Sequence, residues 1–203
     1  MKVNHCLFVV ILALGLFACS KSDIEYENSF QKSEKALSTF KASNNNSYLF
    51  EVTGGTWVGY SWKTSIKVTN GVAVERKFTY TGFDNIIKPS AGWDAESISA
   101  ILVAMQITAA EYEANAGEKL SETLDWVETG AAIGSHKNSP ASAFLTLDEI
   151  YSTAKNDWLK KKPNVETYFE TKNNGMISNC GYVENGCMDD CFRGISISLI
   201  QPL

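Results

Sequence analysis

The sequence predicts a single α+β domain in which an antiparallel sheet of hairpins and a meander buries one face under helices. Three observations lead to this prediction. Alternating apolar residues, typical of half-buried strands, recur over 48–80 and 165–199. Asn-Gly pairs, which favour tight turns, separate several of these segments. Apolar residues at helical spacing follow capping signals between the two regions.

The composition is typical of a globular domain. Hydrophobic residues make up 44% of the chain, aromatic residues 11%, and the formal net charge is −5. Because no basic cluster is present, a nucleic-acid partner is not expected. The sequence contains no phosphate loop, dinucleotide fingerprint or His-Glu-x-x-His motif, and we expect no cofactor.

The first part of the domain is expected to form a helix followed by a strand. Phe30, Leu37 and Phe40 lie at near-helical spacing and predict a helix over 29–41. Alternation of apolar and polar residues then predicts a strand over 48–52.

Asn70-Gly71 predicts a hairpin between the next two strands. Their inward faces comprise Trp62, Thr64, Ile66 and Val68, and Val72, Val74, Arg76 and Phe78. A two-residue turn would place these sets on opposite faces, because side chains alternate along a strand. A three-residue loop over 69–71 would pair Val68 with Val72, so we predict a bulged hairpin.

Capping signals mark the helices of the second half. Asp94 and Thr108 can each begin a helix, so this region holds one helix or two short ones. Thr146 and Glu149 form a capping box at the start of a helix that ends before Pro163. We expect this helix and the first one to cover the buried face of the sheet.

The last forty residues are expected to form a three-stranded meander. Two-residue turns at Asn174-Gly175 and Asn185-Gly186 give a consistent register. In that register Phe169 lies opposite Cys180, and Cys180 lies opposite Cys191.

The N-terminus has the pattern of an export signal. Lys2 precedes a short apolar run, Leu7–Leu16, which is too brief to span a bilayer. The run ends in Leu16-Phe17-Ala18-Cys19, which resembles the lipobox of bacterial lipoproteins. The resemblance implies cleavage before Cys19, a diacylglyceryl thioether on its sulfur, and an acylated, palmitate-type N-terminus.

This signal defines the predicted organisation of the chain. Residues 1–18 are the signal peptide, 19–28 a lipid-anchored tether, and 29–203 the single α+β domain. Removal of Lys2 changes the charge from −5 to −6, so acyl chains rather than basic residues must hold the protein at the membrane, its first expected partner. The absence of Asp beside Cys19 resembles outer-membrane sorting, with the periplasmic or surface face left open.

Three cysteines remain after processing, namely Cys180, Cys187 and Cys191. An exported protein meets oxidising conditions, so a disulfide is expected and one thiol is left over. The predicted register favours Cys180–Cys191. Cys187 becomes the alternative partner of Cys180 if the hairpin is bulged.

A metal site is the alternative reading of this cluster, with Cys180, Cys187, Cys191 and His136 as ligands, since Cys₃His is a known zinc set. The cysteine spacing is not typical of zinc sites. Glu184, Asp189 and Asp190 lack the spacing of a calcium loop. His136 lies among small and polar residues and indicates exposed loop, and no Gly-x-Ser-x-Gly motif accompanies it.

A second candidate ligand site contains the aromatic residues Trp57, Tyr60 and Trp62, which follow Gly54-Gly55. Such rings can stack on a sugar. They also dominate hydrophobic cores, and packing is the simpler interpretation.

Four short segments resemble a family of small secreted bacterial proteins of unknown function. They are Tyr48–Phe50, Ile66–Gly71, Thr146–Tyr151 and Gly194–Ile197. The resemblance implies an envelope-associated α+β domain and supplies no catalytic residue. The segment 89–143 fits least well and is a candidate insertion.

We therefore expect an envelope lipoprotein with a non-enzymatic binding or structural role, whose protein or glycan partner the sequence does not identify. The alternatives are a metal- or thiol-dependent enzyme or sensor that uses the cysteine cluster, and a carbohydrate-binding lipoprotein.

Overall fold

The computed structural model describes residues 23–203, so the predicted signal peptide and Cys19 lie outside the described residues. The helices are α1 (Glu27–Ser43), α2 (Ala95–Ala104), α3 (Ala109–Ala116), α4 (Leu120–Leu124) and α5 (Leu147–Thr153). The strands are β1 (Tyr48–Gly55), β2 (Ser61–Thr69), β3 (Val72–Phe83), β4 (Ile86–Ile87), β5 (Asp125–Thr129), β6 (Val165–Glu170), β7 (Asn179–Glu184) and β8 (Arg193–Pro202).

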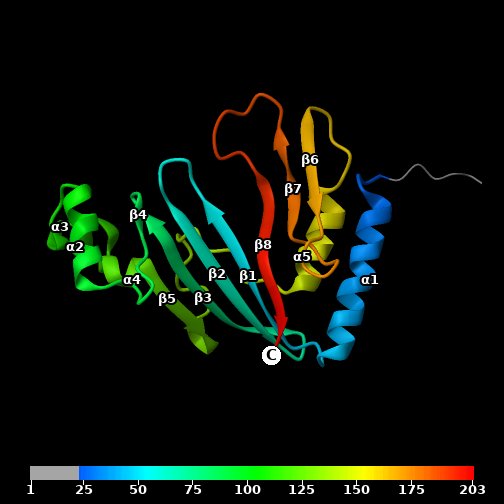
Figure 1. Cartoon of the computed structure of the whole chain (residues 1–203), viewed down its shortest axis with the longest axis horizontal. Coiled ribbons are helices and arrows are strands. Elements are labelled where there is room, and N and C mark those ends of the chain that lie inside the picture. The colour runs from blue at the N-terminus through cyan, green and yellow to red at the C-terminus, as the bar shows by residue number, and fades with distance from the viewer. Residues whose placement is uncertain (1–22) are drawn as a thin grey trace, which may run out of the picture.

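The strands form one open antiparallel sheet, and the predicted α+β class is confirmed (Figure 1). The order along the sheet is β4-β3-β2-β1-β8-β7-β6, and β5 pairs with β3 outside this path. The last strand of the chain, β8, therefore lies beside β1 in the middle of the sheet.

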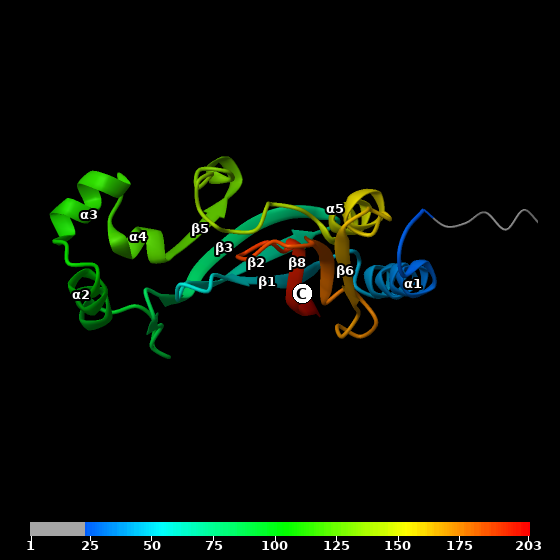
Figure 2. The same cartoon turned by 90° about the horizontal axis from the view of Figure 1, so that it is seen from above.

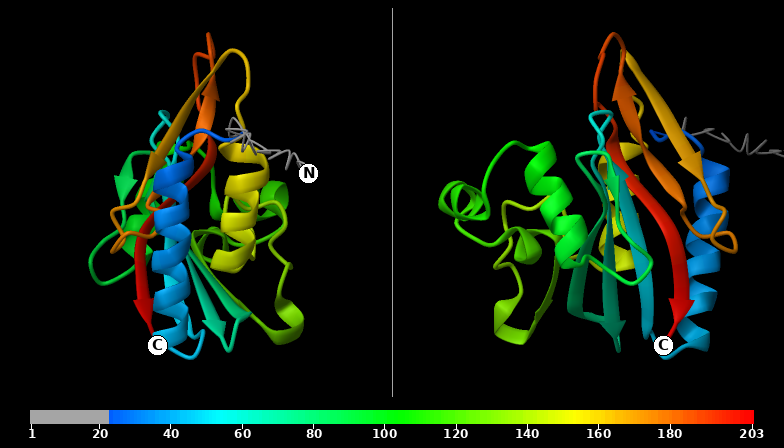
Figure 3. Two further views of the ribbon diagram at one scale, coloured as in Figure 1. Left: turned by 90° about the vertical axis from the view of Figure 1, so that its right-hand side faces the viewer. Right: turned by 60° about the vertical axis from the view of Figure 1, so that its left-hand side comes forward.

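Two hydrophobic clusters lie along the sheet. In the first, α1 and α5 pack on β1, β2, β7 and β8, and Phe30, Phe50, Ile66 and Ile150 are almost completely buried. The two helices lie side by side (Figure 3). Both pack on the sheet, as predicted. In the second, α2–α4 pack with β3 and β5 around Phe78. Figure 2 shows these three helices at the opposite end of the molecule from α1.

The predicted capping signals form the helix starts. The Thr146 hydroxyl accepts a hydrogen bond from Glu149 N–H, and the Glu149 carboxylate accepts one from Thr146 N–H. The same reciprocal arrangement occurs at Asp94 and at Thr108, which resolves the middle region into separate helices. After α5 the chain continues through a π-helical turn, Ala154–Trp158.

The β2–β3 hairpin is bulged, but not where we predicted. Thr69 pairs with Val72 across a two-residue Asn70-Gly71 turn, and the register shifts between Lys67 and Val68. The predicted three-residue loop is therefore wrong, and Val72 is exposed rather than inward-facing. The displaced bulge restores the common inward face farther along the strands.

One of the two predicted strand registers in the C-terminal meander is confirmed, and the other is wrong. Phe169 pairs with Cys180 across the Asn174-Gly175 turn, which confirms that register. On the other side Cys180 pairs with Ile195, not with Cys191. A turn forms at Asn185-Gly186, where Cys187 N–H donates to the Glu184 carbonyl at 3.1 Å, but it does not close the hairpin directly. A longer loop follows before Arg193 pairs with Tyr182, and the predicted Cys180–Cys191 disulfide is not formed.

Candidate functional site

The two central strands of the sheet separate at one end. β1 pairs with β8 up to Val52, where the register shifts at a bulge. Beyond this point Thr53–Gly55 remain paired with β2, whereas Arg193–Ser196 pair with β7. Figure 1 shows β1 and β8 diverging away from the C-terminus. Between them lies a groove of about 840 Å³, which we term the β1–β8 groove.

The structure flanking the groove packs into a different hydrophobic cluster on each side. On the β1 side, the Trp62 ring packs against Tyr80 of the second cluster, with centroids 6.2 Å apart. On the β8 side, Ile195 and Cys180 belong to the first cluster. The bulge at Val52 marks the place where pairing ends, which is a common function of β-bulges.

The groove is lined mainly by apolar groups with an acidic rim. Half-buried Trp62 and Trp158 contribute aromatic surface, and Met188 is 90% exposed at the rim. Among the described residues that line the groove, only Asp189 and Asp190 are charged. Its volume lies within the range of small-ligand sites, about 300–1,000 Å³. An apolar surface with negative charge at its edge favours a cationic, partly apolar ligand.

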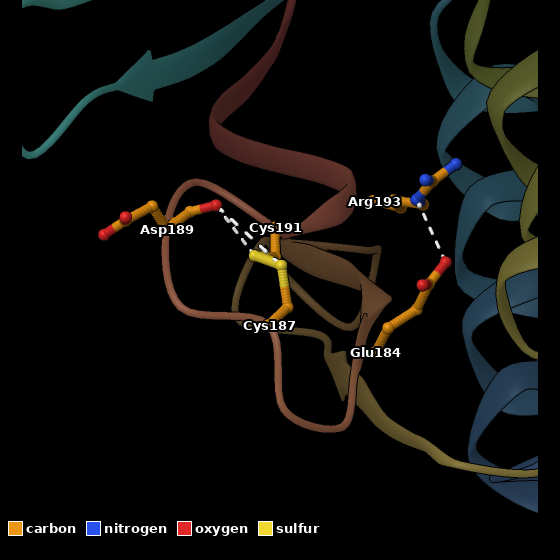
Figure 4. Close-up of a disulfide and its surroundings, with 5 residues drawn as sticks. All are labelled: Glu184, Cys187, Asp189, Cys191 and Arg193. Carbon is orange, nitrogen blue, oxygen red and sulfur yellow. Dashed lines mark hydrogen bonds and ion pairs between the residues drawn. A yellow bond between two sulfur atoms is a disulfide. The ribbon is translucent and has the colours of Figure 1, made fainter.

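A disulfide closes the loop that carries the acidic rim. Cys187 and Cys191 are joined, with Cα atoms 6.1 Å apart, a normal separation. The carbonyl oxygen of Asp189 lies 2.7 Å from Cys191 Sγ, while its carboxylate points away from the disulfide (Figure 4). The disulfide therefore limits the conformations of the segment that presents both carboxylates.

The third cysteine, Cys180, takes no part in the disulfide. Cys180 is free and completely buried in the first cluster, and burial raises the pKa of its thiol to about 12. Cys187 and Cys191 are used by the disulfide, and His136 packs on the second cluster, so the four proposed zinc ligands are not brought together. Within residues 23–203, no group of three His, Cys, Asp or Glu side chains is arranged to hold a metal ion.

His136 belongs to a buried ionic network rather than to an open loop. Glu128 on β5 is completely buried and pairs with Arg76 Nη2 at 2.8 Å and Nε at 3.0 Å. It also accepts hydrogen bonds from the backbone N–H groups of Gly134 and His136 at 2.9 and 2.8 Å. The His136 ring stacks on Trp126 with centroids 4.1 Å apart.

The electrostatics of Glu128 indicate a structural role. Desolvation raises the pKa of its carboxyl group, but the N–H groups of Gly134 and His136, together with the His136 and Arg76 side chains, outweigh this and lower the pKa to about 2. The carboxylate is thus fixed as an acceptor. The hydrogen bonds from Gly134 and His136 to this carboxylate attach segment 130–142 to the sheet. The same segment contributes Pro140 and Ser142 to the groove.

The three predicted aromatic ligand residues occupy different environments. Trp57 is 74% exposed beyond the end of β1. Tyr60 packs edge-on against Phe83, with centroids 4.9 Å apart, and is part of the second cluster. Trp62 lines the groove. They do not form one stacking surface.

Two groove features were not anticipated from the sequence. Trp158 follows the apolar stripe of α5, and the π-helical turn places it at the groove. Asp189 and Asp190 were considered from the sequence only as calcium ligands, whose spacing they lack. Two adjacent acidic residues between Cys187 and Cys191 were the sequence signal that could have indicated the acidic rim.

Comparisons with protein-family models, with curated proteins and with solved structures gave no significant match. The three resemblances noted from the sequence therefore stay predictions. None of the helices in residues 23–203 combines the length and hydropathy needed to cross a bilayer.

Proposed function

We propose that the protein is a lipid-anchored component of the bacterial cell envelope, sorted to the outer membrane, that binds a ligand in the β1–β8 groove without catalysing a reaction. The observation that carries the binding role is the groove itself, with its aromatic surface and acidic rim. The membrane part of the proposal rests on Leu16-Phe17-Ala18-Cys19.

Lipid on Cys19 would hold this domain close to the membrane. Within the described residues, backbone contact with the domain starts at Asp23, whose carbonyl oxygen accepts a hydrogen bond from Lys161 N–H at 3.0 Å, and Ile24 then bridges to Lys160. Even a fully extended chain from Cys19 to Asp23 spans at most about 14 Å. Two or three acyl chains supply the anchoring energy, at about 0.8 kcal/mol per buried methylene.

The anchor can be tested by growing cells that express the full chain with radiolabelled palmitate. We expect label on the protein, its recovery with membranes, and loss of both in Cys19→Ala. A Cys187→Ser/Cys191→Ser variant is the control and should keep the label. An unlabelled wild-type protein, or label that persists in Cys19→Ala, would contradict the anchor.

The environments of Cys180, Cys187 and His136 support a binding rather than a catalytic role. Cys180 is a buried, protonated thiol, and Cys187 is oxidised. His136 is stacked on Trp126, and its Nδ1 lies 3.1 Å from the Glu128 carboxylate. We therefore place the function in the groove and not on the cysteines. Turnover that depends on His136 or Cys187 would contradict this assignment.

Carbohydrate binding is the second candidate, favoured by Trp62 and Trp158 in the groove and by exposed Trp57. Aromatic rings bury large apolar surfaces and can stack on a sugar ring. The test is binding of envelope oligosaccharides to the protein and to Trp57→Ala and Trp62→Ala. Unchanged binding in both variants would remove this candidate.

A further inference from the structure

Resting on the proposed binding function, we propose that the β1–β8 groove receives an extended cationic peptide segment of a protein partner. The peptide pairs as an added strand with the edge of β1 at Thr53–Gly55. Addition of a strand to an open sheet edge is a recurring mode of peptide recognition, with main-chain hydrogen bonds supplying affinity and side-chain pockets supplying specificity.

The backbone of β1 is oriented for this pairing. In an antiparallel sheet, successive residues direct their N–H and C=O groups alternately to the two sides of the strand. Thr56 N–H donates to the Tyr60 carbonyl at 2.8 Å, on the side of β2. By alternation, Gly55 directs its N–H and C=O groups to the opposite side, which is the groove. No described strand pairs with β1 there.

The opposite wall of the groove, β8, also directs backbone groups into it. Ile197 N–H donates to the Ser178 carbonyl at 2.8 Å, so Gly194 by alternation faces the groove. The tip of the Phe192 ring packs over Gly194, where even a Cβ atom would lie only 2.8 Å from it. The Trp62 ring lies over Gly54 of β1 in the same way, 2.6 Å from where a Cβ atom would be, so each wall carries an aromatic ring over one glycine. We assign the peptide to β1 because the Gly55 backbone groups face the groove there.

The side chains around this edge select the composition of the peptide. Side chains of an added strand point alternately to the two faces of the sheet. One set meets the apolar surface of Trp62 and Trp158, and the rim places Asp189 and Asp190 beside the groove. The chain is acidic overall, with a net charge of −5. Alternating apolar and basic residues therefore match the groove, and long-range attraction favours such a segment.

The direct test is fluorescence anisotropy with a labelled decapeptide of alternating Lys and Val and the full-length protein purified in detergent. We expect saturable binding. Because hydrogen bonding alternates along a strand, one of two analogues, N-methylated either at every Lys or at every Val, should bind at least about 10-fold more weakly. Equal binding of the parent and both analogues would overturn strand addition.

A matched pair of double variants tests whether the acidic rim attracts the peptide. Asp189→Asn/Asp190→Asn should weaken decapeptide binding by about 3- to 10-fold at low salt, as expected for exposed ion pairs. Glu96→Gln/Glu113→Gln removes the same charge from exposed positions on α2 and α3, away from the groove, and should leave binding unchanged. Equal effects of the two double variants would refute recognition by the rim.

The outcomes separate this inference from the proposed function. If the decapeptide fails to bind while an envelope oligosaccharide binds in a Trp62-dependent manner, the peptide inference is wrong and the binding function stands. If neither probe binds, both the inference and the groove function are wrong. Palmitate labelling then decides the lipid anchor independently.

Discussion

Replacing Glu128 by Gln should be among the most destabilising conservative changes in this chain. The substitution keeps the shape of the side chain but removes its charge, and leaves Arg76, with an 8% exposed side chain, without a counterion. Breaking a buried ion pair from one side costs about 3–5 kcal/mol. The lowered pKa gives a similar figure. A shift from 4.5 to about 2 corresponds to about 3 kcal/mol of stability at neutral pH.

The pH dependence of the free energy of unfolding tests the same interaction in a second way. Because the pKa of Glu128 is lower in the folded state, its contribution is complete above the unfolded value near 4.5 and is lost as pH falls toward about 2. We expect urea denaturation, followed by tryptophan fluorescence, to show a large gap between wild type and Glu128→Gln at pH 7. The gap should narrow progressively below pH 4.5.

An exposed ion pair serves as the control for Glu128. Glu184 and Arg193 lie 3.5 Å apart with side chains 58% and 65% exposed, so Glu184→Gln should cost less than about 1 kcal/mol. A loss below about 1 kcal/mol in Glu128→Gln would refute the reasoning. A gap to wild type that stays constant between pH 7 and pH 3 would refute it as well.

The remaining predictions concern a buried tyrosine and the cysteines. The Tyr151 hydroxyl bonds to Ser33 Oγ at 2.6 Å and accepts from Ile177 N–H at 3.0 Å, so Tyr151→Phe should lower the free energy of unfolding by about 1–3 kcal/mol, and exposed Tyr26→Phe should not. The intact mass should be two hydrogens below that of the reduced chain, because one disulfide is formed. An alkylating reagent should label Cys180 only after denaturation, and labelling of the native protein would contradict the burial of this side chain. Cys187→Ser should cost about 2 kcal/mol in chemical denaturation, because the disulfide closes a short loop.

Local chemistry predicted much of the fold. The capping box at Thr146 and the Asn174-Gly175 turn depend on residues close in sequence, and both formed as expected. Asn185-Gly186 forms a turn but failed as a two-residue hairpin signal, because a turn sequence does not reveal whether strand pairing resumes directly after it. Here it begins a longer loop that is closed by the Cys187–Cys191 disulfide.

The candidate site depended more on contacts between distant segments. Glu128 pairs with Arg76, which is 52 positions away, and no sequence spacing connects them. An inward-facing Arg in a strand was nevertheless a signal that a buried carboxylate was needed. The groove itself could not be predicted, because it arises where β1 and β8, far apart in the sequence, stop pairing at Val52.

The most direct test of the binding account is amide hydrogen exchange of the full-length protein with and without the Lys–Val decapeptide. We predict slower exchange at Thr53–Gly55, with the Gly55 amide most affected, because its N–H group gains a partner. Exchange on α2 and α3 should stay unchanged. Protection that omits Thr53–Gly55, or that is confined to the exposed residues around Trp57, would contradict the claim that an extended peptide adds to β1.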